Sequence, residues 1–235
     1  MTGNGPIRTQ AAVAILTGFI LSVWPVAAQD GAAILQKIDA ATQARYEHVL
    51  GFSDTEHYAV YRGAEQTHPA AEMTVRVTYR KGVGKSYKVL SQSGSALIQH
   101  FGLKPLIENE QEINDPAKVA DSWFTTANYV MRVEAGQTRM LEGRTCVGVS
   151  IKPKRSAPNM IDGTVWVDPE NGAILEVEGI ASKAPSIFAG TTHMMRQYAM
   201  MDGYAQATHA LAESSGMFGR TVVKIEYSDY KIEVK

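Results

Sequence analysis

One short stretch, residues 163–179, constrains the fold more than any other part of the chain. Apolar side chains alternate with polar or aromatic ones before and after a central turn. In that turn Pro169 presets φ, and Asn171-Gly172 accepts positive φ. The stretch therefore predicts a β-hairpin with one apolar and one polar face. An antiparallel sheet that covers something on one face only has this pattern.

The same alternation recurs along the chain and predicts ten or eleven antiparallel strands. The clearest ones are expected at about residues 52–62, 73–80, 86–91, 129–134, 144–152, 163–168, 173–179, 187–200, 204–213 and 221–232. A sheet with this many strands curls rather than staying flat. We therefore expect an α+β, mostly β fold in which a long sheet curls around helices.

Helices are expected at the start of the mature chain and in its middle. Asp30 can cap a helix that runs to about residue 46, with Ile38 in its apolar stripe. Three short helices are expected at residues 95–101, 104–113 and 115–123. They have too little apolar surface to fold alone, so they are expected to cover the sheet.

The first 28 residues have the plan of a secretory signal peptide. Arg8 precedes an apolar run, and Pro25-Val26-Ala27-Ala28 follows as a small-residue exit. We expect cleavage after Ala28 and one domain over residues 29–235. The alternative is an uncleaved anchor, but the apolar run is shorter than the ~20 residues of a membrane span.

Charge and cysteine content exclude several classes of protein. Cleavage leaves 22 basic against 24 acidic side chains, a net charge of −2, which does not attract nucleic acid. Cys146 is the only cysteine, so no intramolecular disulfide can form, and it lies too far from the signal to be an N-terminal lipidated residue. With 45% hydrophobic and 20% charged residues, the chain is neither disordered nor a polytopic membrane protein.

Motifs for catalysis, metal or cofactor binding do not emerge. The Gly-Lys-Ser run that ends at residue 86 has Tyr79 where a phosphate loop needs glycine. The six histidines lack the spacing of a metal site. Ser150 lacks a nucleophile elbow, and Glu176 and Glu178 lie where a solvated strand face is expected. We predict no catalytic residue, no metal and no cofactor; a hydrolase that uses Ser150 and Glu176 is the remaining enzymatic alternative.

A long curled sheet with a loose helical filling suits an acyl chain as ligand. Ten methionines could adapt to variable apolar partners, or could fill ordinary gaps in the core. Each buried CH₂ contributes roughly 0.8 kcal/mol, so one long chain could gain on the order of 10 kcal/mol before ordering costs.

Several segments together resemble a known family. They are the hairpin Gly163-Thr-Val-Trp-Val-Asp-Pro-Glu-Asn-Gly-Ala-Ile-Leu-Glu-Val-Glu, Ala127-Asn128-Tyr129, Pro153-Lys154-Arg155 and Ile225-Glu-Tyr-Ser-Asp-Tyr230. With the leading helix, they resemble the LolA-like outer-membrane lipoprotein-sorting proteins, a group that includes the LolB acceptor and the RseB/MucB regulators. The resemblance implies a curved antiparallel unclosed β-barrel wrapped around an N-terminal helix and short covering helices. It also implies a periplasmic role in carrying or sensing lipid-modified proteins.

The expected function is therefore a soluble, monomeric periplasmic carrier of lipoprotein or lipid acyl chains, with possible envelope donor and acceptor proteins as partners. The alternative is a regulatory sensor of the RseB type that contacts an envelope protein. The resemblance makes Arg80 and Tyr87 the nearest counterparts of residues that hold a helical lid. Strand parity and the helical cover give the expected lining: Val75, Val77, Tyr79, Tyr87, Val89, Trp123, Phe124, Met131, Val149, Val165, Val167, Leu175, Val177 and Ile225.

Overall fold

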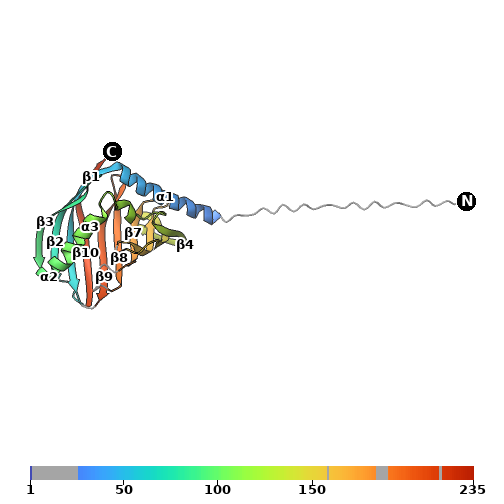
Figure 1. The fold of residues 1–235 in the computed structure, drawn as a ribbon. Coiled ribbons are helices and arrows are strands. Elements are labelled where there is room, and N and C mark those ends of the chain that lie inside the picture. Colours follow the sequence, from blue (N-terminus) through green and yellow to red (C-terminus); the bar gives the residue numbers. More distant parts are fainter. Residues whose placement is uncertain (2–25, 158, 184–189, 217–218) are drawn as a thin grey trace.

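The fold is one long antiparallel sheet with helices on its concave side (Figure 1). The computed structural model describes Met1 and residues 26–157, 159–183, 190–216 and 219–235. The predicted signal peptide therefore lies almost wholly outside the described residues. None of the described helices has both the length and the apolar character needed to cross a membrane.

The sheet has ten strands in the order β3-β2-β1-β10-β9-β8-β7-β6-β5-β4, so β3 and β4 are its two edges. The strands are β1 (Val49–Arg62), β2 (Ala71–Arg80), β3 (Gly84–Gly94), β4 (Tyr129–Leu141), β5 (Arg144–Pro153), β6 (Ile161–Val167), β7 (Ile174–Ala181), β8 (Thr192–Met201), β9 (Tyr204–Gly216) and β10 (Gly219–Val234). Neighbouring strands are consecutive in sequence except β1 and β10, which pair antiparallel along most of their length. The predicted fold class, a curved antiparallel sheet that does not close, is confirmed.

The helical segments differ in extent from the prediction. They are α1 (Val26–His48), α2 (Ala96–Ile98), the π-helical turn η1 (Gln99–Leu103), α3 (Lys104–Ile113) and the 3₁₀ turn η2 (Val119–Ser122). Because α1 begins at Val26, Asp30 lies inside the helix and is not its cap.

The first two predicted central helices are one continuous segment, residues 96–113, which we call the lid. Pro105 does not open a new helix. The chain instead widens into η1 just before it, where the Lys104 N–H donates to the carbonyl of Gln99. A π-turn shifts the hydrogen-bond pattern by one residue, which accommodates a proline that has no N–H to donate. The third predicted helix is wrong in extent, because only η2 forms there.

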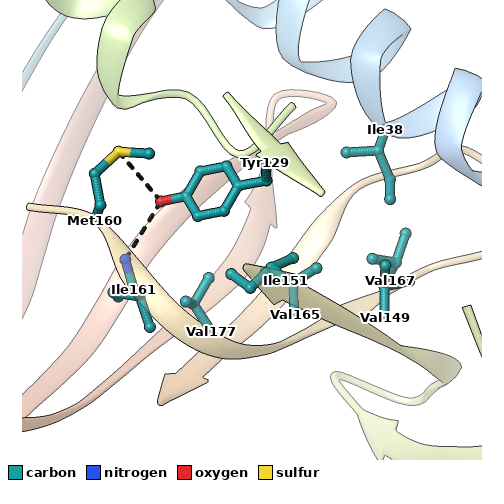
Figure 2. Close-up of a cluster of buried hydrophobic side chains, with 9 residues drawn as sticks. All are labelled: Ile38, Tyr129, Val149, Ile151, Met160, Ile161, Val165, Val167 and Val177. Carbon is teal, nitrogen blue, oxygen red and sulfur yellow. Dashed lines mark hydrogen bonds between the residues drawn. The ribbon is translucent and has the colours of Figure 1, made fainter. Parts of the chain in front are cut away.

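Two apolar clusters fill the concave side of the sheet. The first, which we call the α1 cluster, lies beneath α1 (Figure 2) and consists of Ile38, Tyr129, Val149, Ile151, Met160, Ile161, Val165, Val167 and Val177. The second, the α3 cluster, lies beneath the lid and consists of Tyr58, Val60, Ala71, Met73, Val75, Val77, Leu103 and Ile225. The core is therefore divided between the two helices and not shared by them.

The turn of the 163–179 hairpin holds α1 against the sheet. Gly172 has a φ of 78° and lies so close to α1 that a Cβ there would overlap the backbone of Lys37 and Ile38. Lys37 Nζ also donates to the carbonyl of Pro169, at 2.6 Å. This contact carries Ile38 into the α1 cluster, where it is fully buried.

Candidate functional site

The lid crosses the concave side over the α3 cluster. Leu103 is 1% exposed and lies among the β-strand side chains of that cluster. Ile98, Leu106 and Ile107 pack against it from the same helical segment. These residues recur at three- to five-residue spacing, which puts them on one side of the helical segment, toward the sheet.

The start of the lid is fixed to the edge of the sheet. The Ser95 side chain caps α2 by accepting from the Ile98 N–H. Gln99 Nε2 donates to the carbonyls of Glu72 and Ser93, both at 2.7 Å, and so joins the lid to β2 and β3. The lid therefore has a firm attachment at its N-terminal end.

A cluster of charged side chains holds the other end of the lid. Glu110 of α3 accepts from Arg196 Nη2 on β8 at 3.2 Å, and lies 3.7 Å from Lys85 Nζ on β3. Lys85 also lies 3.9 Å from Glu56 of β1. We call Glu56, Lys85, Glu110 and Arg196 the ionic cluster. It sits on the side of the sheet that was expected to be uniformly apolar.

The ionic cluster is largely screened from solvent. The side chains of Glu56, Lys85 and Glu110 are 3%, 14% and 18% exposed. Burial alone would raise the pKa of Glu110, but the positive charges of Arg196 and Lys85 and their hydrogen bonds outweigh it and lower this pKa. Glu110 is therefore anionic while the lid is closed.

Asp54 adds a second unusual carboxyl group to the same side of β1. It is completely buried, and within the described residues neither of its carboxylate oxygens has a hydrogen-bond partner. Burial, followed by the nearby charge of Glu56, raises the pKa of Asp54 to about 7. Glu56 by contrast accepts a hydrogen bond from the Tyr58 hydroxyl.

The Tyr87 hydroxyl is a further polar group without a partner near the ionic cluster. It is buried and makes no hydrogen bond within the described residues. Burial, together with the charges of Glu110 and Glu56, raises the pKa of Tyr87 far above its ordinary value. The hydroxyl therefore keeps its proton and is a free donor.

Most of the predicted lining residues lie on the concave side, but in two groups. Val75, Val77, Tyr87 and Ile225 belong to or pack against the α3 cluster. The α1 cluster or its packed shell contains Phe124, Met131, Val149, Val165, Val167 and Val177. One continuous lining was expected, and the structure instead separates it into two patches.

Other predicted lining residues lie elsewhere. The Tyr79 ring stacks on Phe52 with centroids 5.0 Å apart, and Trp123 contacts Tyr46 at the same distance. Val89 lies on the edge strand β3 and is 49% exposed.

Strand parity predicts the wrong face of the sheet for Leu175. A bulge shifts the pairing of β6 with β7 between Trp166 and Val167, so Ile174 and not Leu175 joins the α1 cluster. Leu175 packs with Cys146 and Trp166 in a third, separate cluster. One extra residue in a strand reverses the face to which each side chain beyond that residue points.

Arg80 does not make the lid contact that the resemblance implied. It is exposed at the end of β2, and within the described part of the chain it forms no ion pair. Lys85 and Arg196 contact the lid instead. Sequence reasoning missed them because single charges in strands give no signal, although Asp54, Glu56 and Tyr58 alternate along β1 as a buried face would.

On the convex face, Glu176 and Glu178 belong to one ion-pair network. Arg139 ion-pairs with both, its guanidinium lies 4.1 Å from the ring centre of Trp166, and Trp166 Nε1 donates to Glu178 at 2.9 Å. The expectation of a solvated face is wrong for Glu176, which is buried. Ser150 donates to the carbonyl of Arg132 at 3.2 Å.

The apolar side chains beneath the lid are covered in this conformation. Two surface depressions, of about 430 Å³ and about 310 Å³, lie over β6 to β9 and beside the loop after β5, and neither is lined by α1 or the lid. The lid and its neighbours cover Val75 and Val77 completely. The described residues also contain no group of three or more side chains arranged to hold a metal ion.

Among the comparisons with known proteins, only the one with solved structures finds matches. No protein-family model and no curated protein matches the chain. A domain assigned to outer membrane lipoprotein sorting, from Vibrio parahaemolyticus, is similar at a TM-score of 0.47 and 14% identity, over 87% of this chain and 93% of that one. A LolA superfamily protein from Nitrosomonas europaea gives a TM-score of 0.44 and 11% identity, over 86% and 93%.

The Pseudomonas aeruginosa MucA/MucB complex also matches, with a TM-score of 0.26 and 9% identity over 86% of this chain and 99% of that one. These are proteins of the group that the sequence resembles, and the matches cover most of the chain. At such identities and TM-scores the similarity says nothing on function, so function must be argued from this chain's own residues.

Proposed function

We propose that this protein is a periplasmic carrier that binds an acyl chain of a lipoprotein or lipid beneath the lid, and that it takes part in outer-membrane lipoprotein sorting. One observation supports this most strongly. An 18-residue helical segment, which is not part of the sheet, covers the apolar α3 cluster on the concave side. Moving it would break no hydrogen bond between strands.

The lid is attached in a way that suits such movement. Its N-terminal end is bonded to β2 and β3 through Gln99, whereas its C-terminal half is held by Leu106, Ile107 and the ion pairs of Glu110. A helix held at one end by backbone acceptors and at the other by side chains can swing out about its fixed end.

The free energy gained by burying an acyl chain is similar to the free energy lost when the lid side chains leave the sheet. Burying one leucine or isoleucine side chain is worth about 1.5–3 kcal/mol, so the four apolar lid side chains contribute on the order of 10 kcal/mol at most. An acyl chain of a dozen or more CH₂ groups recovers a similar amount, at roughly 0.8 kcal/mol for each group. The ligand can therefore replace the lid at little net cost in apolar burial.

The test is direct detection of a bound lipid. We expect native mass spectrometry of protein exported to a periplasm to show one acylated molecule per chain. We also expect dodecanoate to displace the neutral fluorescent probe N-phenyl-1-naphthylamine. Protein that carries no lipid and from which no fatty acid displaces the probe would contradict the carrier function.

A regulatory sensor is the second candidate, and a separate observation favours it. Leu97 and Phe101, one turn apart on the lid, are 69% and 72% exposed. Exposed apolar side chains of this size on a movable element suit contact with another protein. Isolation of one stoichiometric envelope protein, whose binding lipid only modulates, would favour the sensor over the carrier.

A further inference from the structure

We propose that the ligand carries an anionic head group, a carboxylate or a phosphate, which takes the place of Glu110 on Arg196 and Lys85. This inference rests on the proposed function, and adds the chemistry of the ligand's polar end. The acyl chain would lie on the α3 cluster, with the head group in the ionic cluster next to it.

The pairing of Arg196 provides the first reason. Within the described residues, Glu110 is the carboxylate that pairs with Arg196, whose side chain is 31% exposed. When the lid moves out, Glu110 leaves with it. A screened guanidinium without its partner is unfavourable, because it has lost solvent without gaining a counter-charge. A neutral ligand would leave that cost in place, whereas an anionic head group would remove it.

The free hydroxyl of Tyr87 provides the second reason. It is a buried donor that has no partner among the described residues. Its residue is the cross-strand neighbour of Val77 and packs against the α3 cluster. The hydroxyl makes no bond to the Glu110 carboxylate, so a head group that binds the two cations would need an oxygen beyond the position of that carboxylate to accept from Tyr87 as well.

The charge balance of the site also fits one incoming anion. With Asp54 protonated, Lys85 and Arg196 balance Glu56 and Glu110. Glu56 stays occupied by the Tyr58 hydroxyl and Lys85 when the lid leaves. Exchange of Glu110 for a singly charged head group therefore leaves the buried charge unchanged, and a cationic or neutral head does not.

The site adjoins the apolar patch without a break. Glu56 lies opposite Val75, and Lys85 precedes Tyr87 by two positions on β3, which pairs with the strand of Val75. An amphiphile can therefore place its head on the ionic cluster and its chain along Val75, Val77 and Ile225 in one extended pose. The two sources of such a head group, a fatty acid and a phosphate lipid, share this chemistry.

The experiment compares ligands that differ only in the head group. Dodecanoate, methyl undecyl phosphate and neutral dodecanamide compete for N-phenyl-1-naphthylamine bound to the full mature chain. We expect the anionic ligands to displace the probe at concentrations at least about tenfold lower than the amide, a ratio typical of one charged contact. Displacement of the probe at a lower concentration of dodecanoate would point to a fatty acid, and at a lower concentration of methyl undecyl phosphate to a phosphate lipid.

Variants test whether the named residues cause the preference. Arg196→Gln should strongly reduce it, because only Lys85 remains, and Arg196→Lys should largely keep it. Glu110→Gln should strengthen binding of the anions about tenfold because it removes the competing carboxylate. Glu108→Gln, an exposed change on the same helix, is the matched control and should alter nothing. Thermal unfolding of each variant establishes that it is folded.

The outcomes separate the two proposals. Equal displacement by the amide and the anions would overturn the head-group inference and leave the carrier function standing. A preference that is undiminished in folded Arg196→Gln would also overturn the inference. Failure of every ligand to displace the probe would refute both.

Discussion

Replacement of Asp54 by asparagine should make the protein more stable at neutral and alkaline pH, and leave it unchanged in acid. Asp54 is fully buried without a hydrogen-bond partner in the described structure, and its pKa is raised from 3.8 to about 7. Asparagine has the same shape and cannot ionise. The substitution thus removes the buried charge and little else.

The magnitude follows from proton linkage. Below pH 3.8 the carboxyl is protonated in both the folded and the unfolded chain, so its charge has no effect on stability. Between pH 3.8 and about 7 the folded chain keeps a proton that the unfolded chain releases, and the free energy of unfolding falls as the pH rises. The loss is about 1.4 kcal/mol per pH unit and reaches on the order of 4 kcal/mol above pH 7.

Urea unfolding at a series of pH values between 4 and 8 measures this difference. The curves for the wild type and Asp54→Asn should coincide near pH 4 and separate steadily as the pH rises. Asp162→Asn, a change in an exposed carboxyl of β6, should follow the wild type throughout. Parallel pH profiles for Asp54→Asn and the wild type would refute the assignment of a raised pKa to this group.

Three further substitutions test the packing of the helices. Ile38→Ala empties a fully buried position in the α1 cluster and should lower the free energy of unfolding by about 2–5 kcal/mol, measured in urea. Gly172→Ala should cost clearly more than Gly203→Ala, because both glycines have positive φ but only the first lies against α1; a smaller or equal cost in thermal unfolding would contradict the proposed turn contact. Leu103→Ala should loosen the lid and speed amide hydrogen exchange within it, whereas Leu97→Ala on the exposed side should not, and equal exchange in both variants would show that the lid is held by other contacts.

The antiparallel pairing of strands that are joined by short turns could be predicted because local signals determine it, whereas the pairing of β1 with β10 could not. Short turns join most consecutive strands, so each strand pairs with the next along the chain, and the alternation of side chains locates both faces. Val165, Val167 and Val177 were placed correctly for this reason. The same reasoning failed at Leu175, because a single bulge is decided by packing between β6 and β7 and leaves no mark in the sequence pattern.

The polar interior could not be predicted in the same way. Charged side chains in a strand are normally assigned to solvent, and nothing in the local sequence indicates that Lys85 pairs with a carboxylate of the lid or that Glu56 is buried beside it. Glu110 and Arg196 are 86 residues apart in the chain and meet only through the curvature of the sheet. Long-range ion pairs of this kind are properties of the assembled fold, so the candidate site had to come from the structure.

The pairing of β1 with β10 has a consequence for how the sheet is assembled during folding. These two strands lie far apart in the chain, so the part from β3 to β1 and the part from β10 to β4 can each form from neighbouring strands before they join. Until they join, each part has a bare edge that could pair with another molecule. This one long-range pairing connects the two parts, and it is expected to be the slow step in completing the fold.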